Sequence, residues 1–78
     1  MTIQISTFKI LSTGTDGGHR YIETEITHQG KSRRLTVFFK DKSEEARIQH
    51  GINLTISGRL QDEGETYGLL LLESEIVG

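Results

Sequence analysis

The sequence predicts a small all-β domain: a closed barrel of five strands with one short helix between the third and fourth strands. Three observations support this prediction. Apolar and polar residues alternate in five segments of roughly nine residues each, as in half-buried strands. The chain contains no proline and nine glycines, most of which fall between these segments. After residue 40 the alternation gives way to a helical pattern.

The composition indicates one globular domain spanning residues 1–78, with 33% hydrophobic and 26% charged residues. A chain of this size buries little surface, so self-association would add stability. The absence of cysteine excludes disulfides, thiolate metal sites and a cysteine nucleophile. No apolar run approaches the length of a membrane span, and the N-terminus lacks a secretory signal. We therefore expect a cytoplasmic protein with no membrane partner.

The first two strands are expected over 2–11 and 19–27, joined by a glycine-rich turn at 12–18. In the first segment the apolar parity changes between Ile5 and Phe8, which predicts a bulge or bend near Ser6 and Thr7. The second segment places its isoleucines on one face and Tyr21 on the other.

A tight hairpin at 28–31 leads to the third strand, whose inward and outward residues are separated by their alternation. Leu35, Val37 and Phe39 share the core face. The opposite face carries Arg34, Thr36, Phe38 and Lys40. One of two adjacent phenylalanines, Phe38, is therefore expected outside the core.

A helix of about two turns is expected over 41–51. Asp41 and Glu44 have capping-box spacing, Ala46 and Ile48 form a small apolar set, and Gly51 is a stop signal.

The fourth strand, 52–60, alternates cleanly and puts Gly58 on its inward face, as a tightly coiled strand requires. After a turn at 61–66, the fifth strand, 67–77, is apolar on both faces through its leucines. One leucine pair is therefore expected beneath another element or a subunit.

Five long strands with this helix position fit the OB-fold, a five-stranded Greek-key barrel, better than an SH3-like barrel or a plain α+β sheet. The run "VFFKDKSEEARIQHGINLTISGRL" resembles the middle of bacterial single-stranded DNA-binding proteins. Its matching positions are Ala46 in the helix, Gly51, and Gly58 with Arg59. The closing "LLLLESEI" is similar to the last barrel strand of that family.

This resemblance covers residues 37–77 and implies binding of single-stranded nucleic acid, DNA before RNA. The link at 61–66 is short and acidic where the family often has a basic, aromatic arm. What carries over by position is therefore Phe38 and its basic neighbours on the third strand.

The residues themselves predict the same kind of site. The net charge of −2 gives no overall basic footprint, yet residues 31–40 contain four cations and no acid. Cations follow phosphates, and an exposed ring stacks on an unpaired base. The candidate nucleic-acid-binding residues are Lys31, Arg33, Arg34, Phe38, Lys40, Tyr21, Arg59 and Tyr67.

A second hypothesis is a protein-interaction module, in which Phe38 covers the helix, a second copy of the chain or a larger protein partner. Glu23 and Glu25 are expected to form cross-strand charge pairs with Arg34 or Lys40. The three histidines, His19, His28 and His50, have no metal-ligand spacing. No nucleophile-and-base motif is present, so we expect neither an enzyme nor a cofactor.

Overall fold

The chain folds into one curled, barrel-like β-sheet of six strands with two short helices, seen in a computed structural model that describes residues 1–14, 18–49 and 53–77. The strands are β1 (Thr2–Ile5), β2 (Lys9–Ser12), β3 (Arg20–His28), β4 (Lys31–Phe39), β5 (Leu54–Asp62) and β6 (Leu69–Ile76). The helices are α1 (Lys42–Glu45) and α2 (Gly64–Tyr67). The expected all-β class is confirmed.

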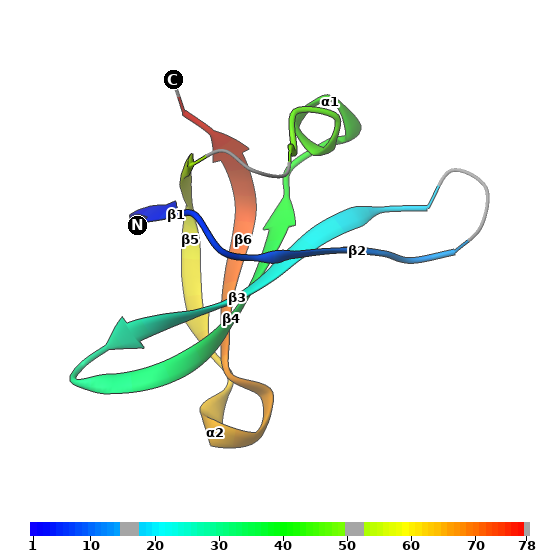
Figure 1. Cartoon of the computed structure of the whole chain (residues 1–78). Coiled ribbons are helices and arrows are strands. Elements are labelled where there is room, and N and C mark those ends of the chain that lie inside the picture. The colour runs from blue at the N-terminus through cyan, green and yellow to red at the C-terminus, as the bar shows by residue number, and fades with distance from the viewer. Residues whose placement is uncertain (15–17, 50–52, 78) are drawn as a thin grey trace.

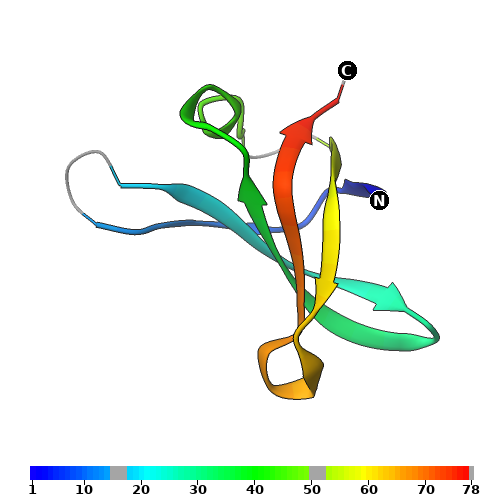
Figure 2. The ribbon, with the colours of Figure 1, turned by 180° about the vertical axis from the view of Figure 1, so that it is seen from behind.

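The strand order is β1-β5-β6-β4-β3-β2, so the two N-terminal strands lie at opposite ends of the order. All neighbouring pairs are antiparallel except β4 and β6, which are parallel. Figure 1 shows the long β3–β4 hairpin crossing the β5–β6 pair, with β1 beside β5 and β2 running along β3. From behind, Figure 2 shows α1 and α2 at opposite ends of β6. The sheet thus curls so that its two ends are joined by one short link.

The predicted strand count of five was wrong because the first segment is divided. The break falls at residues 6–8, where the sequence parity changes. Before the break the chain pairs with β5, with Ile3 opposite Ile56. After the break it pairs with β3, with Ile10 opposite Ile22. The bend expected near Ser6 and Thr7 is therefore a complete change of partner.

The core lies inside the curl and is drawn from every strand except β2. Its buried members are Ile5, Ile22, Leu35, Val37, Ile48, Leu54, Ile56, Leu69 and Leu71. Phe8, Ile10 and Phe39 pack against this cluster while remaining partly exposed. The inward faces predicted for the third and fourth strands are confirmed over the described residues.

The two connections around β4 follow local sequence chemistry. In the β3–β4 hairpin, Gln29 and Gly30 both adopt positive φ, 52° and 78°, as a two-residue type I′ turn requires. After β4, Asp41 caps α1 by accepting a hydrogen bond from the Glu44 N–H at 2.9 Å.

Both helical regions depart in detail from expectation. The regular part of α1 is one turn rather than two, and Ile48 beyond it enters the core while Ala46 stays exposed. The proposed stop at Gly51 lies outside the described residues. The turn expected at 61–66 contains α2, and Tyr67, expected to open the last strand, belongs to this helix. Within the described residues, neither helix is long and apolar enough to cross a bilayer.

A bulge in β6 explains why its leucines could not be assigned to faces by alternation. Leu71 lies opposite Val37 and Ser74 lies opposite Phe39, so β6 has one more residue than β4 between these positions. The same mismatch occurs against β5, and Glu73 has a φ of 54°. The bulge sends both Leu71 and Ser74 into the interior.

Gly58 on β5 makes room for this bulge. A Cβ atom at Gly58 would lie 2.4 Å from the Ser74 Oγ and 2.8 Å from the Leu71 Cγ. These separations are too short for a side chain, and the buried surroundings leave little space to adjust. The inward glycine predicted from alternation is therefore required by close packing against β6.

We predict that Gly58→Ala lowers the free energy of unfolding by about 1–3 kcal/mol, because an added methyl group overpacks the β5–β6 contact. Chemical denaturation followed by circular dichroism measures this change. Ser57→Ala, one residue earlier on the same strand, is the control and should change stability by less than about 0.5 kcal/mol. Equal stability of Gly58→Ala and the parent protein would contradict the packing argument.

Candidate nucleic-acid interface

Two aromatic rings lie together on the outer face of the β3–β4 hairpin. Tyr21 and Phe38 are cross-strand partners, and their rings are stacked with centroids 5.5 Å apart and an angle of 28° between planes. Phe38 is 39% exposed, whereas its neighbour Val37 is completely buried. The alternation therefore separates the adjacent side chains of β4 as expected, and it leaves a two-ring surface facing outward.

Other apolar side chains continue this surface on the neighbouring strands. Leu11 of β2 lies opposite Tyr21. Leu70 of β6 lies opposite Thr36, and Leu72 is part of the bulge beside Phe38. None of these side chains belongs to the core cluster, and all are partly exposed. We call Leu11, Tyr21, Phe38, Leu70 and Leu72 the outer band.

The predicted cations do not form one strip, because alternation divides them between the two faces of β4. Arg34 follows the parity of Phe38, whereas Lys31 and Arg33 follow that of Leu35. The Lys31 amine is 4.0 Å from Glu65, and both side chains are largely exposed. The eight candidate residues therefore lie on more than one surface.

Arg33 serves as an anchor for the turn after β5. Its guanidinium donates to the Asp62 carboxylate at 2.8 and 3.4 Å and to the Gly64 carbonyl at 3.2 Å. The side chain is only 16% exposed. The hydrogen bond from Arg33, joined by one from the Gly64 N–H, lowers the pKa of Asp62. Arg33 is thus committed to the fold and is poorly placed to contact a phosphate.

Two further candidates, Lys40 and Arg59, form ion pairs with carboxylates of β6. The Lys40 amine lies 2.7 Å from the Glu75 carboxylate, and this hydrogen bond raises the pKa of Lys40. Arg59 lies 3.4 Å from Glu73.

The last two candidates, Arg34 and Tyr67, lie toward α2. Arg34 donates one hydrogen bond to the Thr66 carbonyl at 3.1 Å. Its other guanidinium N–H groups have no hydrogen-bond acceptor among the described residues. Tyr67 on α2 is 69% exposed. Of the two, Arg34 points from the same face of β4 as the aromatic pair.

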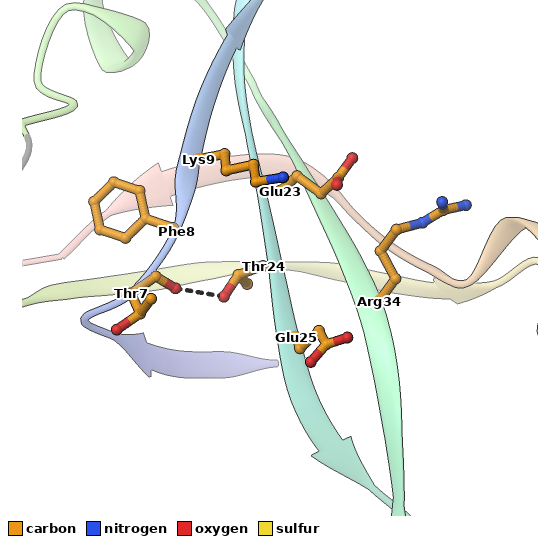
Figure 3. A pocket seen from close by; sticks show the side chains of 7 residues that line it. All are labelled: Thr7, Phe8, Lys9, Glu23, Thr24, Glu25 and Arg34. Atoms are coloured by element: carbon orange, nitrogen blue, oxygen red, sulfur yellow. Dashed lines mark hydrogen bonds between the residues drawn. The ribbon is translucent and has the colours of Figure 1, made fainter.

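A hollow of about 490 Å³ opens beside the aromatic pair, where β2 pairing with β3 ends. It is lined by Thr7, Phe8, Lys9, Glu23, Thr24, Glu25 and Arg34. In Figure 3 these side chains come from three neighbouring chain segments, and the Thr24 hydroxyl donates to the Thr7 carbonyl at 2.7 Å. The hollow therefore exists because the first segment breaks at residues 6–8 and turns away from β3.

Lys9 and the two glutamates are the functional candidates that sequence reasoning missed or assigned differently. The parity of the first segment, with Phe8 and Ile10 inward, could have placed Lys9 on the outer face. The expected charge pairs also differ from those observed. Glu25 lies opposite Arg34 in the register, but no ion pair joins them among the described residues, and Lys40 bonds to Glu75 instead.

Glu45 at the end of α1 binds the chain where it enters β3, at His19 and Arg20. Its buried carboxylate accepts hydrogen bonds from the Arg20 N–H at 2.6 Å and the His19 Nδ1 at 3.0 Å. Burial alone would raise the pKa of Glu45, but these hydrogen bonds outweigh it and lower the pKa. Residues 15–17 of this glycine-rich stretch lie outside the described part of the chain. The role of Glu45 here is structural.

Over the residues that the structure describes, no group of three or more His, Asp or Glu side chains is arranged to hold a metal ion. We take the outer band and the adjoining hollow as the candidate site, because there exposed rings lie next to Lys9 and Arg34.

We predict that Glu45→Gln destabilises the fold at neutral pH by about 1–3 kcal/mol and flattens the acid side of the stability profile. The pKa of Glu45 is lower in the folded than in the unfolded chain, so its ionised form stabilises the fold above the ordinary value near 4.5. That contribution is lost as the pH falls through the folded-state pKa.

Thermal unfolding between pH 3 and 7 measures this difference between the variant and the parent protein. Glu65→Gln is the control, because the Glu65 side chain is 90% exposed. A Glu45→Gln profile parallel to that of the parent protein would show that the carboxylate charge does not matter.

Comparisons of this chain with protein-family models, curated protein sequences and solved structures found no match.

Proposed function

We propose that this chain is a small OB-fold protein that binds single-stranded nucleic acid and has no enzymatic activity. The strand order supports the OB assignment. When β1 and β2 are counted as one bent strand, the sheet has five strands, and the first borders both β5 and β3. The parallel pairing of β4 with β6 and the position of α1 between β4 and β5 agree with this Greek-key arrangement.

The observation that carries the functional proposal is the outward stack of Tyr21 and Phe38. Two rings with centroids 5.5 Å apart form a platform before any ligand binds, which lowers the cost of ordering these side chains on binding. Unpaired bases stack on such platforms, and each stacked base contributes about 1–3 kcal/mol. Bases within a duplex are already stacked, so the platform favours single strands.

The partners of the cations around the platform indicate how much stacking and phosphate contacts would each contribute to the binding energy. Lys40 and Arg59 are held by carboxylates, and Arg33 is largely buried. Lys9 and Arg34 line the hollow next to the platform, and each lies opposite a glutamate on β3. We therefore infer that stacking contributes more than counterion release, in contrast to proteins with long basic grooves.

We predict that Phe38→Ala weakens binding of a short, unstructured single-stranded DNA by roughly tenfold, the loss expected for one stacked base. Fluorescence anisotropy with a labelled oligonucleotide at low salt measures this change. Val77→Ala is the control, because Val77 is also an exposed apolar residue, 46% accessible, but lies outside the outer band. Absence of binding by the parent protein at low salt would overturn the proposed function.

A second candidate function is supported by the leucines of the outer band. Leu11, Leu70 and Leu72 add apolar surface that a polar nucleic-acid backbone would not use. An exposed apolar patch of this kind is typical of protein interfaces. We propose as the alternative that the outer band forms the contact in a homodimer or binds a larger protein.

The alternative predicts that the parent protein sediments as a dimer and that Leu72→Glu shifts it to a monomer, because a charge would be buried at the contact. Analytical ultracentrifugation over a range of protein concentrations measures this. Glu75→Gln, an exposed change on the same strand, is the control. A parent protein that is monomeric at every concentration would exclude the homodimer.

A further inference from the structure

The carboxylates of the hollow differ from the other carboxylates of the molecule. Within residues 1–14, 18–49 and 53–77, the other Asp and Glu side chains each take part in a hydrogen bond or an ion pair. Glu23 and Glu25 have no such partner among these residues, and both line the hollow. Their hydrogen-bond acceptors are therefore free to bind a ligand.

The hollow offers donors as well as acceptors. Lys9 lies opposite Glu23, and Arg34 lies opposite Glu25, so each carboxylate has a cation on the adjacent strand. Figure 3 shows Phe8 on the other side of β2 from these charged groups. The formal charges of the four groups cancel, and the volume of about 490 Å³ is within the range of small-molecule sites. Such a lining suits a ligand without net charge that carries both hydrogen-bond donors and acceptors.

We propose that the hollow binds a guanine base of the single strand, with Glu25 and Arg34 recognising its edge. Guanine places N1–H and an N2 amino donor side by side, and one carboxylate can accept hydrogen bonds from both. Its O6 and N7 are acceptors, for which arginine is the commonest partner. Arg34 uses one N–H for the Thr66 carbonyl and retains others for this purpose.

The other bases match this pair of groups less well. Cytosine and adenine each offer one exocyclic amino group to a carboxylate. Thymine offers a single N–H between two carbonyl oxygens, which would face the Glu25 carboxylate unfavourably. Guanine is therefore the base that satisfies both members of the Glu25–Arg34 pair.

The position of the hollow suits a base next to the stacking platform. Tyr21, Glu23 and Glu25 alternate along the outer face of β3, at a rise of about 3.3 Å per residue. A strand whose base stacks on Tyr21 can therefore place another base over Glu25 while following β3. This inference rests on the proposed function and adds a base preference at one position to it.

The test compares an all-thymine oligonucleotide with the same oligonucleotide carrying one central guanine. A third version carries hypoxanthine, which lacks the N2 amino group, in place of guanine. We expect the parent protein to bind the guanine version at least about fivefold more tightly than the all-thymine version. The hypoxanthine version should lose most of this preference, since only one of its two donors remains.

Glu25→Gln should bring the guanine-to-thymine affinity ratio close to one. Glu65→Gln is the charge-matched control: it removes one negative charge at a side chain that is 90% exposed and lies outside the hollow, so it should leave the ratio unchanged. Either variant can raise affinity for all oligonucleotides by removing a negative charge, so the ratio is the quantity compared. The oligonucleotide series on the parent protein tests the preference independently of any effect of the variants on folding.

Two failures are distinguishable. Equal affinity for the guanine and thymine versions, with binding still weakened by Phe38→Ala, would overturn guanine recognition and leave the stacking function in place. Absence of binding to every oligonucleotide would overturn the proposed function and this inference with it. A ratio that survives Glu25→Gln would overturn the role given to Glu25.

Discussion

The division of the first segment between two partners is the constraint on which the rest of the structure depends. Because β1 pairs with β5 and β2 pairs with β3, four residues at each end of a short link hold both ends of the strand order. The link at residues 6–8 must leave β3 to reach β5, and this departure opens the hollow beside Glu23 and Glu25. Closure of the sheet and creation of the candidate site thus have one structural cause.

The bulge in β6 is the second constraint, because β6 lies between β5 and β4. One extra residue near Glu73 restores an inward direction at Ser74 after the polar Glu73 has turned outward. Gly58 permits the close approach that this geometry needs. The bulge also places Leu72 beside Phe38 on the outside. The bulge that fills the interior of the curled sheet therefore also determines part of its apolar outer surface.

The sequence predicted those features that depend on local alternation and turn chemistry. The inward faces of β4 and β5, the hairpin at Gln29 and Gly30, and the Asp41 cap each follow from neighbouring residues alone. The strand count, the register of β6 and the ion pairs depended on which distant segments pair. Glu25 and Arg34 illustrate this. Alternation predicted that both side chains lie on the outer face of neighbouring strands, where they are indeed cross-strand neighbours. The hydrogen bond from Arg34 to Thr66 on α2 could not be predicted, because it joins segments far apart in the sequence.

The charge distribution of the outer face decides between two ways of binding an anionic chain. A continuous basic strip would attract phosphates regardless of the bases, but here Lys40 and Arg59 are held by carboxylates of β6. Beside the aromatic pair, Glu23 and Glu25 offset the charges of Lys9 and Arg34 and offer hydrogen-bond acceptors to donor groups such as those on base edges. In the proposed mode of binding, the bases of a single strand would face the sheet and its phosphates would face away from it. That orientation is the one in which Tyr21 and Phe38 can stack, so the glutamates and the rings favour the same mode of binding.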